Sequence, residues 1–320
     1  MSECWDSSIK DELQMVEEEI RRSIRSEQPI LTEICEYVIS SGGKRMRSGV
    51  TLLSYLANGG RETDDVVKIA AAFEMIHSAT LIHDDINDRS EMRRGRPSAY
   101  KRFGLQQALV GGDFLFVKAF AIGGFFDEEI VGLVADACTA IAESEIVQFE
   151  KEGQIAPLDV YLRIIEGKTA RPIMAGARIG AYLAKAGPDR IHAMGEYGLN
   201  IGMAFQIVDD ILDIIGKQGS LGKPLMVDFH EGKATLPLIQ AMEDPKVGPR
   251  LSKLFRKKRK TNADIEEASA LIAMTDTVER ARQRAKGYAE RALAALEGVQ
   301  DSGHKQGLIR LATMVVERDY

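Results

Sequence analysis

The chain has 320 residues, of which 45% are hydrophobic and 28% charged, so it can bury a large core and is neither a disordered tail nor a mini-protein. Its 42 basic and 48 acidic residues give a net charge of -6, which offers no electrostatic case for nucleic-acid binding. The three cysteines, Cys4, Cys35 and Cys138, are widely spaced and form no CxxC pair, which fits neither a disulfide framework nor a zinc site. We therefore expect a protein of the reducing cytoplasm.

The N-terminal segment is acidic, where a signal peptide would need a basic region followed by an apolar run. No stretch approaches 18 uninterrupted apolar residues, so we expect no membrane span. The sequence has no repeat of fixed period and no low-complexity linker. Residues 1–320 are therefore expected to form a single domain.

Hydrophobic residues recur at three- and four-residue steps in nearly every long segment. Leu13, Val16, Ile20 and Ile24 follow this period between residues 11 and 26, with charged residues between them, which predicts an amphipathic helix. The same period covers 63–88, 105–122, 128–150, 158–184, 191–216, 234–242 and 263–297. The pattern predicts an all-α fold, a helical bundle.

Three segments interrupt these helices. A glycine turn from Ser41 to Arg47 carries three cations, and a loop from Gly216 to Gly232 contains a proline. A basic run, residues 256–260, closes a predicted helix. Because cations favour helix C-termini, we expect this run to be a solvated helix end.

Two clusters of aspartates carry the sharpest chemical signal. The first, His83-Asp84-Asp85-Ile86-Asn87-Asp88, ends the predicted helix over 63–88. The second, Asp209-Asp210-Ile211-Leu212-Asp213, lies in the apolar helix over 191–216. In each cluster two aspartates four residues apart share a helix face, so their repulsion is unfavourable unless a cation lies between them.

Both clusters offer oxygen ligands, which suit a hard ion such as Mg²⁺. One such cluster alone could equally be a solvated helix face or an ion-paired cap, but two matching clusters with apolar flanks favour a metal site. Mg²⁺ usually completes its shell with water and phosphate oxygens, so cations that bind phosphate should lie nearby. The candidate cations are Lys44, Arg47, Arg93, Arg94, Arg96, Lys168, Lys223 and Lys233.

The order of these landmarks resembles that of the trans-polyprenyl diphosphate synthases of the geranylgeranyl or medium-chain type. The matching segments are Gly42-Gly43-Lys44-Arg45 with Arg47, Leu81 to Asp88, Met92-Arg93-Arg94-Gly95, Gly112-Asp113, Lys168-Thr169, Phe205-Gln206 with Asp209, Asp210 and Asp213, and Glu231-Gly232-Lys233 before Thr235-Leu236-Pro237. They cover roughly residues 40–240. The resemblance implies an isoprenoid synthase bundle with a central active-site cavity. It also implies head-to-tail condensation of isopentenyl diphosphate with dimethylallyl, geranyl or farnesyl diphosphate.

The resemblance also implies roles for individual residues. Up to three Mg²⁺ ions would be held by Asp84, Asp88 and Asp209, with Asp85, Asp210 and Asp213 in support. The allylic diphosphate would be bound by Arg93, Lys168, Thr169, Gln206, Lys223 and Lys233. Isopentenyl diphosphate would be bound by Lys44, Arg47, His77 and Arg94. Catalysis would depend most on Asp84, Asp88, Asp209, Lys168 and Gln206.

Two segments depart from the family pattern. Residues 224–226 read Pro-Leu-Met where a short turn containing glycine is usual, which puts the role of Lys223 in doubt. Arg171-Pro172 follows Lys168-Thr169 where a helix commonly continues. His83, beside the first aspartate, is expected to pack the helix or support its neighbours rather than react.

Product length should depend on residues one to three turns before Asp84. Short-chain members of the family often have an aromatic residue where this chain has Ala79 and Thr80, so the tunnel should be open there. Ile76 and Phe73 are then the candidate floors. Since each helical turn rises about 5.4 Å, close to one isoprene unit, we expect a product longer than C15, about C20 to C30. A C15 farnesyl diphosphate synthase is the alternative.

The resemblance implies a homodimer whose ligands are small isoprenoid diphosphates. The predicted helix over 105–120 is apolar around most of its circumference and must be buried somewhere. Three other functions compete. A terpene cyclase would not need a second diphosphate site, and a non-catalytic partner subunit would not need both acidic clusters. A di-iron carboxylate protein would match Glu74-x-x-His77, but would need that spacing twice.

Overall fold

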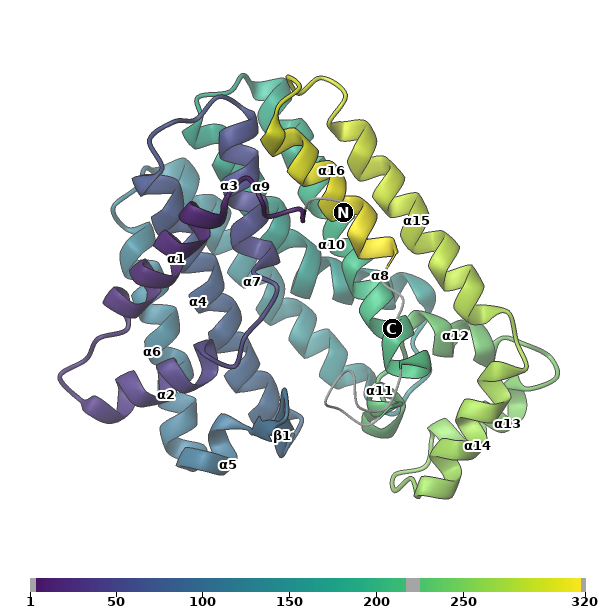
Figure 1. Ribbon diagram of the computed structural model, residues 1–320. Helices are drawn as coiled ribbons and strands as arrows, with labels where there is room; N and C mark the ends of the chain where they lie inside the picture. Colours follow the sequence, from purple (N-terminus) through teal and green to yellow (C-terminus); the bar gives the residue numbers. More distant parts are fainter. Residues whose placement is uncertain (1–3, 217–224, 318–320) are drawn as a thin grey trace. The chain divides into compact units, whose positions relative to one another are not determined.

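The computed structural model describes residues 4–216 and 225–317 (Figure 1). Helices dominate this part of the chain, which confirms the all-α prediction, and the strands found in it are a two-residue antiparallel pair, β1 (Met92–Arg93) and β2 (Arg96–Pro97). The helices are α1 (Lys10–Ser23), α2 (Pro29–Ile39), α3 (Met46–Ala57), α4 (Asp64–Asn87), α5 (Ala99–Phe103), α6 (Leu105–Gly123), α7 (Glu128–Lys151), α8 (Leu158–Ile165), the π-helix η1 (Glu166–Ala170), α9 (Arg171–Leu183), α10 (Pro188–Ile215), α11 (Val227–Glu231), α12 (Leu236–Met242), α13 (Gly248–Phe255), α14 (Asn262–Ala273), α15 (Thr277–Ala295) and α16 (Gly303–Val316).

The chain divides into two compact units. Unit 1 comprises Met1–Asp136, Pro172–Gly198 and Ala295–Leu311, and unit 2 comprises Ala137–Arg171, Leu199–Ala294 and Ala312–Tyr320. Each unit is described by itself below. The single-domain expectation stays a prediction.

Unit 1 is built around α4, which contacts α1, α3 and α6. Most of the α4 side chains are buried, because the helix is apolar around much of its circumference. Glycines of α9 allow close packing against α3. A Cβ atom added to Gly176 would lie 2.4 Å from Thr51 Oγ1, and one added to Gly180 would lie 2.4 Å from the Thr51 carbonyl oxygen. These two glycines therefore allow α9 to pack closely against α3.

Unit 2 contains two hydrophobic clusters. One joins α8, α10, α12 and α15 through residues such as Ile207, Leu236 and Ala285. The other gathers α11 to α14 around Phe229 and Phe255. The second acidic cluster lies on α10, whose apolar face belongs to the first of these clusters.

Three predicted elements differ from the structure. The helix over 158–184 changes to a π-helix at Glu166–Ala170, just before Pro172, which has no N–H to continue an α-helix. The helix over 263–297 is split at residues 274–276, where the Thr275 hydroxyl donates to the Ile272 carbonyl at 2.7 Å and competes with helical bonding. The loop over 216–232 contains α11.

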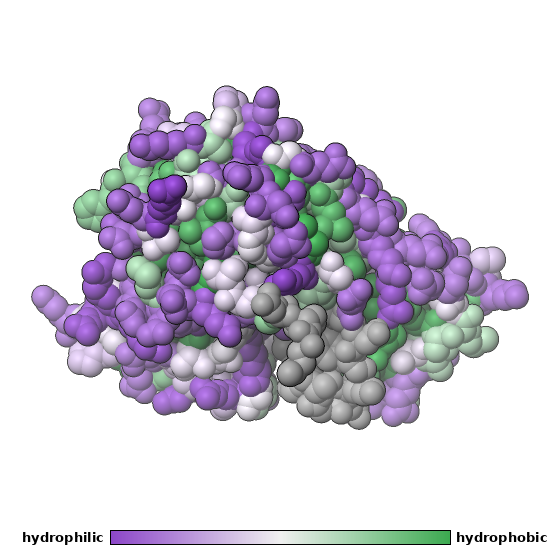
Figure 2. Space-filling view, turned by 45° about the horizontal axis from the view of Figure 1, so that its top comes forward, coloured by the Kyte–Doolittle hydropathy of each residue, from purple (hydrophilic) through white to green (hydrophobic). Residues whose placement is uncertain are grey.

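By length and composition alone, two helices of the described residues are long and apolar enough to cross a membrane, which does not overturn the expectation of no membrane span, because buried core helices pass the same test. In α4, 72% of the apolar window is buried inside the structure, as in the core helix of a soluble protein, whereas in α6 the figure is 28%. Hydrophilic side chains cover much of the face shown in Figure 2, and hydrophobic side chains gather in patches between them.

Candidate active site

The first acidic cluster lies at the C-terminal end of α4 in unit 1. Asp84 and Asp85 belong to the last turn, and Asp88 is the residue that caps it. Arg93 of β1 donates from Nε at 2.9 Å and from Nη2 at 2.6 Å to Oδ1 of the buried Asp85. It also lies within electrostatic range of Asp84 and Asp88. Asp85 therefore orients an arginine beside the other two carboxylates.

A hairpin turn with left-handed residues follows Arg93 and joins β1 to β2. Arg94 and Gly95 have φ values of 51° and 76°, the signs that a two-residue hairpin turn requires. The turn also places Arg94 against the glycine turn before α3. A Cβ added to Gly43 would lie 3.3 Å from Arg94 Nη1, which is 3.5 Å from Ser41 Oγ.

These cations gather around His77. Burial, followed by the charges of Arg47, Arg94, Arg93 and Arg45, holds the pKa of His77 well below its ordinary value. The imidazole is thus neutral at physiological pH and can offer a hydrogen bond rather than a charge. Arg47 and Arg94, predicted with His77 to bind isopentenyl diphosphate, are thus within electrostatic range of it, and Lys44 lies on the glycine turn before α3.

Glu74 has a structural role. This buried carboxylate accepts hydrogen bonds from Arg45 Nη1 at 3.2 Å, from the Ser48 backbone N–H at 3.2 Å and from Ser48 Oγ at 3.0 Å. Its oxygens are therefore occupied by α3 and the residue before it. This arrangement explains the Glu74-x-x-His77 spacing without iron.

The second acidic cluster forms a polar network in unit 2. Thr169 Oγ1 of the π-helix donates to Gln206 Oε1 at 2.8 Å, and Gln206 Nε2 donates to Asp210 Oδ1 at 2.9 Å. Tyr161 of α8 donates from its hydroxyl to Asp210 Oδ2 at 2.6 Å. Thr169 and Gln206, predicted to act together, are thus joined to Asp210, with Asp209 beside it in the chain.

The environment of Asp210 is unusual for a carboxylate. Burial, opposed by the hydrogen bonds from Tyr161 and Gln206 and reinforced by Asp209 and Asp213, raises the pKa of Asp210 to about 7. The tyrosine and the glutamine therefore stabilise an ionised form that burial alone would disfavour. A bound cation would favour the same form.

Asp213 fixes the segment that follows α10. Its two carboxylate oxygens accept the backbone N–H groups of Val227 at 3.0 Å and Asp228 at 3.1 Å, at the start of α11. In this segment Lys233 forms an ion pair with Glu231 at 2.9 Å. Lys223, the remaining predicted cation, lies outside the described residues.

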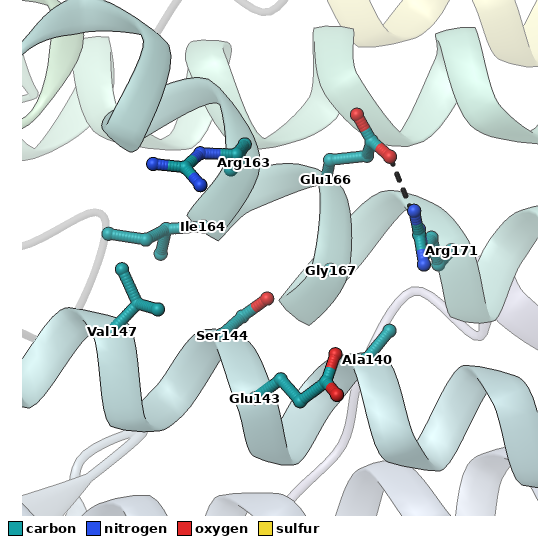
Figure 3. Close-up of a pocket in the computed structure, with 9 residues that line it drawn as sticks. All are labelled: Ala140, Glu143, Ser144, Val147, Arg163, Ile164, Glu166, Gly167 and Arg171. Carbon is teal, nitrogen blue, oxygen red and sulfur yellow. Dashed lines mark hydrogen bonds and ion pairs between the residues drawn. The ribbon is translucent and has the colours of Figure 1, made fainter.

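Lys168 pairs with Glu145 of α7, and both side chains are largely buried. Lys168 lies in the π-helix η1, beside Gly167. Gly167 packs directly on α7, because a Cβ atom added to it would lie 2.7 Å from the Ala140 carbonyl oxygen. A surface cavity of about 200 Å³ lies beside this contact and is lined by Ala140, Glu143, Ser144, Val147, Arg163, Ile164, Glu166, Gly167 and Arg171 (Figure 3). The Glu166–Arg171 ion pair, at 3.2 Å, closes one side of it.

Sequence reasoning missed Tyr161 and Glu145. Tyr161 follows the apolar period of its helix, so it looks like an ordinary core residue, and Glu145 looks like one charge among several on α7. His83 behaves as expected, since its ring stacks on Phe116 of α6 at a centroid distance of 5.8 Å.

The residues proposed to set product length lie on α4 in the core of unit 1. Ala79, Ile76 and Phe73 are buried, and the Phe73 ring lies near Gly176 of α9. The Thr80 hydroxyl donates to the His77 carbonyl oxygen at 2.8 Å, so this side chain is hydrogen-bonded to the backbone of α4.

Comparison with known proteins gives a consistent result. The sequence model described as polyprenyl synthetase matches residues 28–272. The chain is 36% identical to an all-trans-nonaprenyl-diphosphate synthase (geranyl-diphosphate specific) of Rhodobacter capsulatus, over 93% of this chain and 92% of that protein. It is 35% identical to a short chain isoprenyl diphosphate synthase of Methanothermobacter thermautotrophicus, over 96% of each.

A solved structure extends the similarity to the fold. The polyprenyl synthase of Caulobacter crescentus, crystallised with calcium and isoprenyl diphosphate, superposes with a TM-score of 0.93 at 34% identity. The match covers 98% of this chain and 97% of the other. Nearly the whole chain therefore follows one known architecture.

Proposed function

The chain belongs to the polyprenyl synthetase family and is a prenyltransferase that makes a trans-prenyl diphosphate, and we propose that it joins isopentenyl diphosphate to an allylic diphosphate at the residues described above. One observation carries this proposal. In unit 1 the turn with Arg94 separates two arginines, so that Arg93 serves the acidic cluster while Arg94 joins Arg47 and His77. Two neighbouring sites result, one suited to a metal-bound diphosphate and one to a diphosphate bound directly.

Mg²⁺ fits the acidic clusters by the chemistry of their donors, which are carboxylate oxygens. Among the described residues no three His, Cys, Asp or Glu side chains converge on one point. Mg²⁺ is usually held by one or two carboxylates and completed by phosphates and water. We propose Asp84, Asp88 and Asp209 as the direct ligands for up to three ions. When bound, they would neutralise the charge of the departing diphosphate.

The side chains around the clusters would act on the allylic diphosphate. Arg93, Lys168 and Lys233 would place positive charge where negative charge grows as the carbon–oxygen bond breaks. The electron pair of that bond leaves with the diphosphate, and the double bond of isopentenyl diphosphate attacks the allylic carbon. Loss of one proton then forms the new double bond. We propose the departing diphosphate as the acceptor of this proton.

The test is a requirement for two substrates. Purified protein with Mg²⁺ should release diphosphate when both isopentenyl diphosphate and an allylic primer are present. Release from the allylic primer alone would instead indicate a terpene cyclase. No release with any primer would indicate a non-catalytic subunit.

We further propose a product longer than C15, about C20 to C30 by the rise of the helix. The small, buried Ala79 supports an open tunnel, and Ile76 and Phe73 are the bulky residues that follow it along α4. The relatives do not decide the length, because a nonaprenyl and a short-chain synthase match this chain almost equally well. Chromatography should show that Ala79→Phe shortens the product and that Phe73→Ala lengthens it. An unchanged product from Ala79→Phe would refute a tunnel along this face.

We also propose a homodimer formed through α6. The side chains of Leu109, Val117 and Phe120 are 46%, 64% and 43% exposed. Exposed apolar side chains grouped on one helix are typical of an interaction surface. A second copy of this chain is the occupant we propose, because α6 is apolar on nearly every side. Light scattering should give the dimer mass, and Val117→Glu should lower it. A stable monomer at micromolar concentration, or one that enters bilayers through α6, would contradict the dimer.

A cytoplasmic location is our last proposal here. It is supported by Cys4, Cys35 and Cys138, all of which are free thiols. Fractionation of the source cells would test it.

A further inference from the structure

A basic loop joins α13 to α14 in unit 2. We use this name for residues 256–261, in which five consecutive cations precede Thr261. The stretch from 250 to 267 contains seven Lys or Arg residues and three carboxylates, within a chain whose net charge is -6. Positive charge is therefore concentrated here against the trend of the whole protein.

Two of these cations stabilise the fold. The Lys260 ammonium lies 5.5 Å from the ring centroids of both Phe229 and Phe255, and it donates to the His230 carbonyl oxygen at 3.3 Å. Lys257 pairs with Asp264 at 2.5 Å, and Asp264 forms a capping box with Thr261. The loop is thus held to α11, α13 and α14 and presents its other residues on a fixed backbone.

The three remaining cations of the loop, together with Lys253 in the last turn of α13, have no such role. Lys253, Arg256, Lys258 and Arg259 are exposed, and no ion pair found among the described residues includes them. Of the nearby carboxylates, Asp264 is paired with Lys257 and Glu267 with Arg250, which leaves Glu266. A helix C-terminus accounts for Arg256 but not for Lys258 and Arg259, which lie beyond the last turn of α13.

We propose that the basic loop docks this enzyme on an anionic lipid surface. Each cation near such a surface raises the partition of the protein from water to the membrane by about fivefold. Four cations without an ion-pair partner therefore suffice for reversible binding. The reason for docking is the product, and this step rests on the proposed function. Each methylene group that is buried in a bilayer favours the membrane-bound form of the product by about fourfold, so a long prenyl tail partitions into the bilayer. A nucleic-acid partner is less favoured, because the basic loop contains no aromatic residue for base stacking.

The experiment is flotation of the full-length protein with vesicles, without substrates. The vesicles are phosphatidylcholine alone, or phosphatidylcholine with phosphatidylglycerol, at about 0.15 M and about 1 M salt, where the Debye lengths are about 8 Å and 3 Å. The test variant is Lys258→Glu/Arg259→Glu. The matched control is Lys10→Glu/Arg61→Glu, which changes the net charge equally at two exposed cations of unit 1.

The protein should bind the anionic vesicles at the lower salt and leave them at the higher. The basic-loop variant should bind at least tenfold more weakly, and the control should bind like the unchanged protein. Diphosphate release from soluble substrates should be the same in all three, which separates docking from catalysis. Absence of binding by the unchanged protein, or equal binding by the basic-loop variant, would overturn the proposal. So would binding to duplex nucleic acid without binding to vesicles.

Discussion

Tyr161→Phe removes a single oxygen atom from the network around Asp210. The tyrosine hydroxyl donates to Asp210 Oδ2 at 2.6 Å, and Asp210 is 4% exposed, so no water can easily replace it. A hydrogen bond to a charged group contributes about 1.5–3 kcal/mol. Its loss should raise the pKa of Asp210 further above 3.8, so that less of the carboxylate is ionised at neutral pH.

The expected result is weaker activation by Mg²⁺. Loss of a partner that orients a metal-binding carboxylate typically weakens metal affinity or activity by about 10–100-fold. The assay is diphosphate release as a function of Mg²⁺ concentration. Tyr182→Phe is the matched control, because Tyr182 donates to the exposed Asp127 at 2.8 Å, and it should behave like the unchanged protein. If Tyr161→Phe gives the same Mg²⁺ curve as that control, Tyr161 does not position Asp210 for the metal.

Two further changes test the units separately. The pKa of His77 is lowered in the folded chain, so below about pH 6.5 the unfolded chain binds a proton that the folded chain does not. The free energy of unfolding therefore falls by up to about 1.4 kcal/mol for each pH unit of acidification. Urea unfolding of His77→Asn at pH 7.5 and 5.5 should show a smaller loss on acidification. Gly167→Ala should destabilise unit 2 by about 1–3 kcal/mol through its contact with the Ala140 carbonyl oxygen, whereas Gly187→Ala, with open space around it, should not. Equal melting temperatures for the two alanine variants would contradict the packing at the π-helix.

The sequence predicted the long helices because hydrophobic period is a local property. Helices α4, α6 and α7 begin and end within one or two residues of their predicted limits. The π-helix and the split at residues 274–276 were missed, because each depends on a single competing group, the absent N–H of Pro172 and the Thr275 hydroxyl. Such groups act on one hydrogen bond and leave the hydrophobic period unchanged.

The predicted site residues divide in a similar way. The aspartates and cations could be proposed from the sequence because their charges are rare on apolar helices and their order resembles a family. Tyr161 and Glu145 were not found, since their importance comes from a partner far away in the sequence, Asp210 in one case and Lys168 in the other. Asp85 and Asp213 were predicted to support the Mg²⁺ ligands, which stays a prediction; in the structure Asp85 accepts from Arg93 and Asp213 accepts from the start of α11.

The central claim is that both acidic clusters serve one Mg²⁺-dependent prenyl transfer. The most direct measurement is kcat with isopentenyl diphosphate and a saturating allylic primer for Asp84→Asn and Asp209→Asn, with circular dichroism to check the fold. Each variant should keep its helical spectrum and lose at least about 100-fold in kcat, since removing one element of charge stabilisation commonly costs that much. Near-normal turnover by either variant, with Mg²⁺ as the only metal, would contradict the account.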